Sequence, residues 1–177
     1  MYNPLLLKDT AIQIALILKG EDLYNLCSTN KPLLEWICNN PQFWYLKIKQ
    51  DFGINTHETL NRSGSSEDYK FLYNIKDKNR YTLSIMLMDE SEDGNIDHIK
   101  LLLINGTNIH KQNETALRLA AQNGHRDVVE LLLNYGADIH AENDDALRRA
   151  ECNNHKDVVK LLLKHGANIH GYDDDHA

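Results

Sequence analysis

The chain has 177 residues, of which 42% are hydrophobic and 25% are charged, values typical of a globular protein. That length allows one domain, or a small domain joined to a short array of repeats. The formal charge of −7 is unevenly placed: residues 1–80 hold ten Lys/Arg against nine Asp/Glu, and residues 81–177 hold nine against 17. The acidic second half disfavours nucleic acid as a partner, because affinity for phosphates is built from Lys and Arg contacts.

Membrane and secreted classes are also disfavoured. No apolar run approaches the roughly 18 residues that a membrane helix needs, and no secretion signal is recognisable. Three cysteines (Cys27, Cys38 and Cys152) form an odd set without Cys-x-x-Cys spacing, so neither a disulfide framework nor a zinc ribbon is expected. We therefore expect an intracellular protein, cytoplasmic or nuclear, without a membrane partner.

Residues 1–54 predict a small helical domain. Their apolar residues recur at helical spacing, and breaks such as Asn39-Asn40-Pro41 divide the segment into short helices, with Pro41 suited to a first helical turn. Three stretches resemble an F-box: Asp22-Leu23-Tyr24-Asn25-Leu26-Cys27, Thr29-Asn30-Lys31, and Asn40-Pro41 with Phe43-Trp44. The Leu-Pro that usually opens the motif is replaced by Asn3-Pro4-Leu5-Leu6.

The F-box resemblance implies docking to a Skp-type adaptor of a cullin–RING ubiquitin ligase. The residues that would carry this contact are Leu5, Leu6, Ile14, Leu23, Leu26, Asn30, Lys31, Phe43 and Trp44. The alternative is that the helices only cover the apolar end of the following array. Residues 55–68 are polar with Ser and Gly clustered at 63–66, a composition that predicts a linker or loop.

Residues 69–177 predict an array of repeats. A motif of three leucines, then Gly, then Ile-His recurs every 30 residues and ends at His110, His140 and His170. The last two copies agree at 17 of 30 positions, whereas the copy 81–110 matches its successor at nine, so it is the degenerate one. Such a period is typical of stacked helical units, which present a surface and seldom a catalytic cleft.

Each repeat predicts two short helices. Thr115 is placed to cap the first, which runs to about Gln122, and Gly124 supplies the turn. Asp127 opens the second, and Gly136 stops it. The apolar side chains of the second helix cover an arc of about 200°, more than one neighbouring helix shelters, so the unit needs stacked partners.

The repeats resemble ankyrin repeats. The matching stretches are Thr115-Ala116-Leu117-Arg118, where the family has Thr-Pro-Leu-His, Ala120-Ala121, Gly124-His125, and Gly136-Ala137-Asp138-Ile139. Each copy is three residues shorter than the family's 33, so the hairpin between repeats should be clipped. Repeats of this length containing Ile-His resemble those of large DNA viruses. The expected fold is therefore all-α, a small N-terminal helical domain followed by an α-solenoid of ankyrin helix pairs.

The ankyrin resemblance implies a protein-binding scaffold with no catalysis, cofactor or small-molecule substrate. Carried over by position, the partner-binding residues are Lys111, Gln112, Asn113, Glu114, Leu119, Gln122, Asn123 and Arg126 in one copy, and Ala141, Glu142, Asn143, Asp144, Arg149, Cys152, Asn153 and Lys156 in the next. The alternative is that these positions are merely solvated.

The recurring histidines predict structural hydrogen bonds and no metal site. Neighbouring packed helices lie about 8–10 Å apart, whereas a zinc ligand must come within about 2.1 Å of the ion. No phosphate loop or catalytic motif is present in the sequence. We therefore predict a non-enzymatic adaptor in which the array selects a target and the F-box-like segment recruits a ligase. The alternative is a stand-alone scaffold or inhibitor that occludes one partner.

Overall fold

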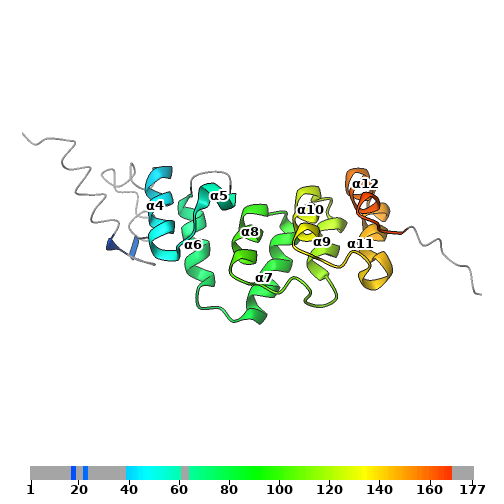
Figure 1. Ribbon diagram of the computed structural model, residues 1–177, viewed down its shortest axis with the longest axis horizontal. Helices are drawn as coiled ribbons and strands as arrows, with labels where there is room; N and C mark the ends of the chain where they lie inside the picture. The colour runs from blue at the N-terminus through cyan, green and yellow to red at the C-terminus, as the bar shows by residue number, and fades with distance from the viewer. Residues whose placement is uncertain (1–16, 19–21, 24–38, 61–63, 169–177) are drawn as a thin grey trace, which may run out of the picture. The chain divides into compact units, whose positions relative to one another are not determined.

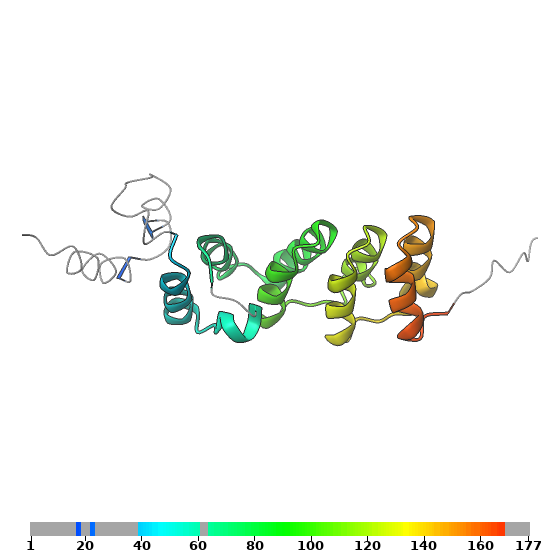
Figure 2. The same ribbon diagram turned by 90° about the horizontal axis from the view of Figure 1, so that it is seen from above.

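The computed structural model describes residues 17–18, 22–23, 39–60 and 64–168, and the chain divides into two compact units, 1–77 and 78–177. Within the described ranges every regular element is an α-helix (Figures 1 and 2), which confirms the predicted all-α class. None of the helices in these ranges is long and apolar enough to cross a membrane.

The described helices of the first unit are α4 (Pro41–Phe52), α5 (Thr56–Leu60) and α6 (Ser66–Ile75). Helix α4 begins at Pro41 as predicted, because Asn40 Oδ1 accepts the backbone N–H groups of Gln42 at 2.9 Å and Phe43 at 3.3 Å. It ends at Gly53, whose φ of 73° is the left-handed conformation common after a helix.

The core of the first unit forms where α4 packs against α5 and α6. The rings of Trp44 and Tyr69 lie 5.5 Å apart between centroids. A buried ion pair joins Lys47 Nζ to Asp51 Oδ2 at 2.9 Å, and the Tyr69 hydroxyl donates to the same oxygen at 2.7 Å. The aromatic packing and this polar contact fix α6 on α4.

The stretch 55–68, predicted to be a linker, includes helix α5 and the first turn of α6. The reason is a capping box: Ser65 Oγ accepts the N–H of Asp68 at 3.1 Å, and the Asp68 carboxylate accepts the N–H of Ser65 at 2.7 Å. Leu60 is buried and ties α5 to the core. Helix α6 lies in the first compact unit, and the second compact unit begins at residue 78.

The second unit contains three helix pairs, which follow one another in Figure 1. They are α7 (Arg80–Asp93) with α8 (Ile96–Ile104), α9 (Thr115–Gln122) with α10 (Arg126–Asn134), and α11 (Ala141–Cys152) with α12 (Lys156–Lys164). The first helices pack in the order α7, α9, α11, and the second helices in the order α8, α10, α12. The unit is therefore a stack of three two-helix repeats in two layers.

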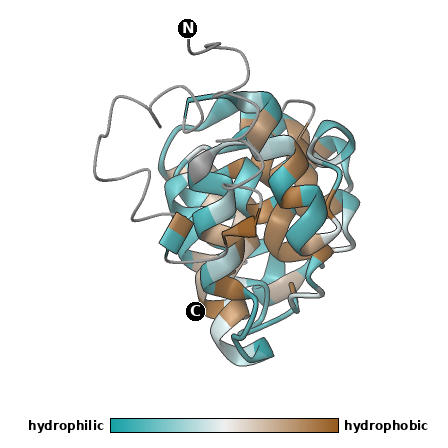
Figure 3. Cartoon of the chain, turned by 90° about the vertical axis from the view of Figure 1, so that its left-hand side faces the viewer, coloured by the Kyte–Doolittle hydropathy of each residue, from teal (hydrophilic) through white to brown (hydrophobic). Residues whose placement is uncertain are grey.

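The core of the stack runs between its two layers. The middle leucine of each repeated triplet (Leu102, Leu132 and Leu162) is completely buried, as are Ala120 and Ala150 of the first helices. Apolar and polar residues occur next to each other on the helices that face the viewer in Figure 3, and buried apolar residues supply this core. As predicted, Asp127 lies in the first turn of α10.

The start of α9 differs from its prediction. Thr115 does not cap the helix: it is the first helical residue, and its hydroxyl donates to the Gln112 carbonyl at 2.7 Å. The capping position is held by Glu114 in the left-handed conformation, without a side-chain cap. The backbone of the preceding turn, and not a hydroxyl, therefore directs the chain into α9.

Candidate protein-binding surface

The first helices of the three repeats share one exposed face. Helix α9 contacts α7 on one side, α11 on the other and its own second helix α10, and α7 and α11 also contact their own second helices, so the first helices expose the side turned away from the second helices. The predicted partner-binding residues that are exposed are Gln112, Asn113, Asn123, Arg126, Glu142, Asn143, Cys152, Asn153 and Lys156. Those that are partly exposed are Lys111, Leu119, Gln122, Ala141 and Arg149.

Glu114 and Asp144 are not on this surface, contrary to their assignment from the resemblance. They are only 4% and 2% exposed. Their carboxylates turn inward and accept hydrogen bonds from Nδ1 of His110 at 2.5 Å and of His140 at 2.9 Å. These residues hold the turns together and offer nothing to a partner.

The junction between repeats contains a left-handed turn in both cases, and at the second junction this turn interrupts the start of α11. Residues 112–114 and 142–144 all have φ between 52° and 60°, a conformation that is costly for residues other than glycine. Arg118 Nη2 donates to the Gln112 carbonyl at 3.3 Å, and Arg148 Nη2 donates to the Glu142 carbonyl at 3.1 Å. The shortened hairpin expected from the short repeat is thus a compact turn, and Arg118 or Arg148 stabilises it by a hydrogen bond.

The two turns also contact each other directly. Asn113 Nδ2 donates to Glu142 Oε1 at 2.5 Å, and both residues are exposed. The exposed tips are therefore connected from one repeat to the next, and a partner would meet a continuous, pre-ordered edge.

Three arginines from two helices converge on Asp145. Its carboxylate lies 3.1 Å from Arg118, 2.9 Å from Arg148 and 2.5 Å from Arg149. Burial raises the pKa of Asp145, but the hydrogen bonds from Arg149 and Arg118 and the charges of Arg149 and Arg148 lower it by more, so the pKa lies below that of an ordinary aspartate. Arg149 also donates from Nη1 to Gln122 Oε1 on α9. The cluster joins α9 to α11 and carries two positive charges beyond its one carboxylate.

His125 and His155, in the turns between the two helices of their repeats, are structural, as predicted. His125 Nε2 lies 2.8 Å from the carbonyl of Glu92, and His155 Nε2 lies 2.9 Å from that of Gln122, one repeat earlier in each case. Among the described residues, no group of three or more His, Cys, Asp or Glu is arranged to hold a metal.

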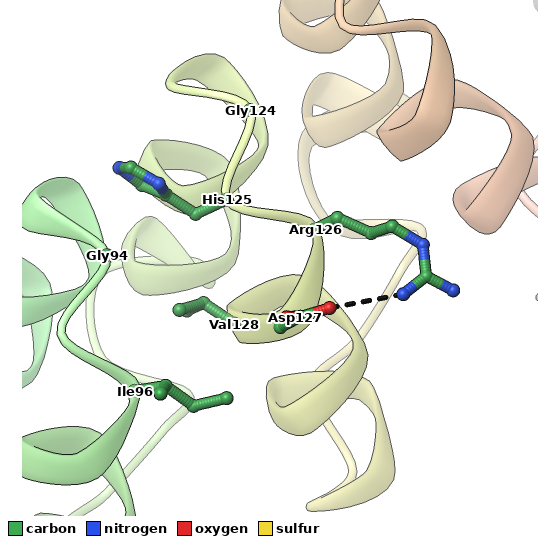
Figure 4. A pocket seen from close by; sticks show the side chains of 7 residues that line it. All are labelled: Gly94, Ile96, Gly124, His125, Arg126, Asp127 and Val128. Atoms are coloured by element: carbon green, nitrogen blue, oxygen red, sulfur yellow. Dashed lines mark hydrogen bonds and ion pairs between the residues drawn. The ribbon is translucent and has the colours of Figure 1, made fainter.

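A pocket of about 320 Å³ opens between the second helices of the first two repeats (Figure 4). It is lined by Gly94, Ile96, Gly124, His125, Arg126, Asp127 and Val128. The Arg126 and Asp127 side chains pair with each other at 3.1 Å and stay largely exposed, and His125 is already bonded to the preceding repeat. These polar groups are thus engaged with each other or with the preceding repeat.

The predicted adaptor contacts divide into two groups. Six lie outside the described residues: Leu5, Leu6, Ile14, Leu26, Asn30 and Lys31. The other three are core residues, because Leu23, Phe43 and Trp44 are at most 3% exposed. Phe43 and Trp44 pack edge to face at 4.9 Å between ring centroids. These three side chains belong to the unit's own core.

Several surface residues were not identified from the sequence. Tyr81, Ile85 and Asp89 are exposed on one side of α7, and Arg118, Arg148 and Asp145 form the cluster described above. The copy 81–110 shares only nine positions with its successor, so the sequence does not mark the surface residues of α7.

Comparison with known families identifies the repeats. Residues 87–173 match the family described as ankyrin repeats (3 copies). No curated protein matches the sequence. Residues 87–173 of the second unit thus match ankyrin repeats, a family of protein–protein interaction modules.

Proposed function

We propose that the chain is a non-enzymatic adaptor with two protein-binding surfaces. The ankyrin array holds a target, and the segment 1–54 docks a Skp-type adaptor of a cullin–RING ubiquitin ligase. Placing both partners on one chain raises the effective concentration of the target at the conjugating machinery, and this requires neither a cofactor nor a small-molecule substrate.

The observation that carries the target-binding half is the exposed face of α7, α9 and α11 with its connected tips. The turns are fixed by Arg118 and Arg148, and Asn113 joins one tip to the next. A surface ordered before binding loses little conformational entropy when a partner docks.

The ligase half is supported by the F-box resemblance and by the separate compactness of residues 1–77. Within the described part of that unit, Ile17 is 77% exposed and Leu46 is 44% exposed. These apolar side chains, in contrast to the buried Phe43 and Trp44, are available to an adaptor.

A second candidate is a stand-alone scaffold or inhibitor that occludes one partner. The burial of Leu23, Phe43 and Trp44 favours it, because the apolar residues assigned to adaptor docking are already used by the unit's core. In that case the N-terminal unit has no ligase contact.

Capture of a purified Skp-type adaptor by the immobilised full chain separates the two candidates. The ligase proposal expects capture by the wild type and at least tenfold weaker capture by Leu46→Asp. The matched control is Ile104→Asp in the array, since Ile104 is also 44% exposed. No capture by the wild type, or equal losses for both variants, contradicts ligase recruitment.

A further inference from the structure

Three structurally equivalent residues on the exposed face differ in chemistry. Asp89, Leu119 and Arg149 are spaced by 30 residues and occupy the same position in α7, α9 and α11. Asp89 is exposed, Leu119 is partly exposed, and Arg149 keeps 38% of its side chain exposed. A line across the repeats therefore passes from an anion, through an apolar group, to a cation.

Contacts between the repeats keep these three residues in register. The bonds from Arg118 to Asp145 and from Arg149 to Gln122 join α9 to α11. Lys111 Nζ lies 4.6 Å from the centroid of the Tyr81 ring, which joins the start of the second repeat to α7.

The surroundings of each end reinforce its character. Near Asp89, the last turn of α7 adds the exposed Glu92 and Asp93, and no basic residue lies in that turn. Near Arg149, Arg118 and Arg148 share the single carboxylate of Asp145, so this end has excess positive charge. The two ends therefore attract groups of opposite sign.

Two further exposed side chains add apolar surface beside Leu119. Ile85 precedes Asp89 by one helical turn and is 36% exposed, and Tyr81 precedes Ile85 by another turn and is 57% exposed. With Leu119 on the next helix, these side chains form an apolar area beside the charged line.

The spacing of the line matches an extended peptide. Neighbouring packed helices lie about 8–10 Å apart. An extended segment in the polyproline II conformation rises about 3.1 Å per residue with three residues per turn, so three residues span one repeat and return the side chain to the same face. Side chains at positions i, i+3 and i+6 of such a segment would thus meet the three helices in turn.

We propose that this face binds an extended protein segment in which a basic, a large apolar and an acidic side chain follow at intervals of three residues. The basic side chain pairs with Asp89, the apolar one lies on Leu119 and Ile85, and the acidic one reaches the arginines around Arg149. This rests on the array being the target-binding part, as proposed above, and it specifies the chemistry of the target.

Labelled synthetic peptides test the proposal on the full-length chain by fluorescence polarisation at low ionic strength. The probes are Lys-Gly-Ser-Leu-Gly-Ser-Glu, its two versions with Lys at both ends or Glu at both ends, and a version with one residue removed from each spacer. The wild type is expected to bind the first probe at least threefold tighter than the others.

The discriminating variant is Asp89→Lys, which makes both ends of the line basic. Asp89 is exposed, so this change leaves the core intact. The probe with two Glu should then bind about 2- to 20-fold tighter than the mixed probe, since an attraction replaces a repulsion between exposed charges. The matched control is Asp157→Lys on α12, where the carboxylate is 81% exposed and away from this face; its ranking of probes should equal that of the wild type.

Equal binding of all probes, or the same change in ranking for both variants, overturns the proposal. Neither result affects ligase recruitment, which the capture experiment measures on the N-terminal unit. If a cellular protein cross-links to the same face but all peptide probes bind with equal affinity, the target-binding role is retained and only the proposed segment is discarded.

Discussion

The imidazole of His155 lies against the backbone of Gly124 in the preceding repeat. A Cβ placed on Gly124 would come within 2.4 Å of His155 Nδ1, and the same relationship joins His125 to Gly94 at 2.6 Å. His155 Nε2 reaches past this glycine to the Gln122 carbonyl. The stack thus depends on a ring-on-glycine contact at each junction between repeats.

Replacing Gly124 by alanine should therefore be strongly destabilising. The substitution places a Cβ at a φ of 78° and drives it into the His155 ring, so we expect a loss of at least about 2 kcal/mol in the free energy of unfolding. The control is Gly106→Ala, because Gly106 has a similar φ of 75° but no atom within 4 Å of the added Cβ. Urea denaturation should show a clearly larger loss for the first variant; equal losses would mean that the ring contact contributes nothing.

A buried leucine tests the packing between layers. Leu132 is completely buried, so Leu132→Ala should cost about 2–5 kcal/mol in the free energy of unfolding. Leu163→Ala is the comparison, since Leu163 is 38% exposed and should lose much less. An unchanged denaturation midpoint for Leu132→Ala would contradict the predicted burial.

The position of Asp145 predicts a pH dependence of stability. Its pKa is lowered in the folded protein, so its carboxylate stabilises the fold above the unfolded pKa of about 3.9, and this contribution is lost as the pH falls through the folded pKa. Asp145→Asn should cost about 1–3 kcal/mol at pH 7 and progressively less below pH 4. Asp157→Asn, at an exposed site, should show no such difference. Parallel stability–pH curves for the wild type and Asp145→Asn would exclude this role.

The left-handed turns predict a stabilising substitution. Gln112 has a φ of 52° and an exposed side chain, and only its backbone carbonyl is used by Thr115 and Arg118. Gln112→Gly should raise the free energy of unfolding by about 0.5–1 kcal/mol, because glycine adopts this conformation without steric cost. Glu151→Gly, at an exposed helical position, should instead be destabilising. A loss of stability in Gln112→Gly would show that the turn is not strained.

The repeat unit was predictable because its signals are local. The leucine triplets, Gly124 and Asp127 indicated two helices and a turn, and the structure has them at those positions. The left-handed turns were not predicted, since Gln112 and Glu142 do not favour a positive φ. Bonds from Arg118 and Arg148, each six residues further along the chain, hold them there.

The surface and the N-terminal unit were less accessible from sequence. Glu114 and Asp144 are typical surface residues by type, yet each turns inward to a histidine. Phe43 and Trp44 were apolar enough for either a core or an interface, and only the packing against Tyr69 decides between them. The Ser65–Asp68 capping box was hidden in a Ser/Gly-rich composition that also fits a linker.

Site-specific photo-cross-linking in cells tests the central claim, that the face of the first helices holds the target. A photoreactive amino acid replaces Asn123, which is exposed on that face, or Tyr135, which follows α10 and is 49% exposed. We predict that the probe at position 123 cross-links a discrete protein and that the probe at position 135 does not. Cross-linking of the same protein from position 135 alone would contradict the account.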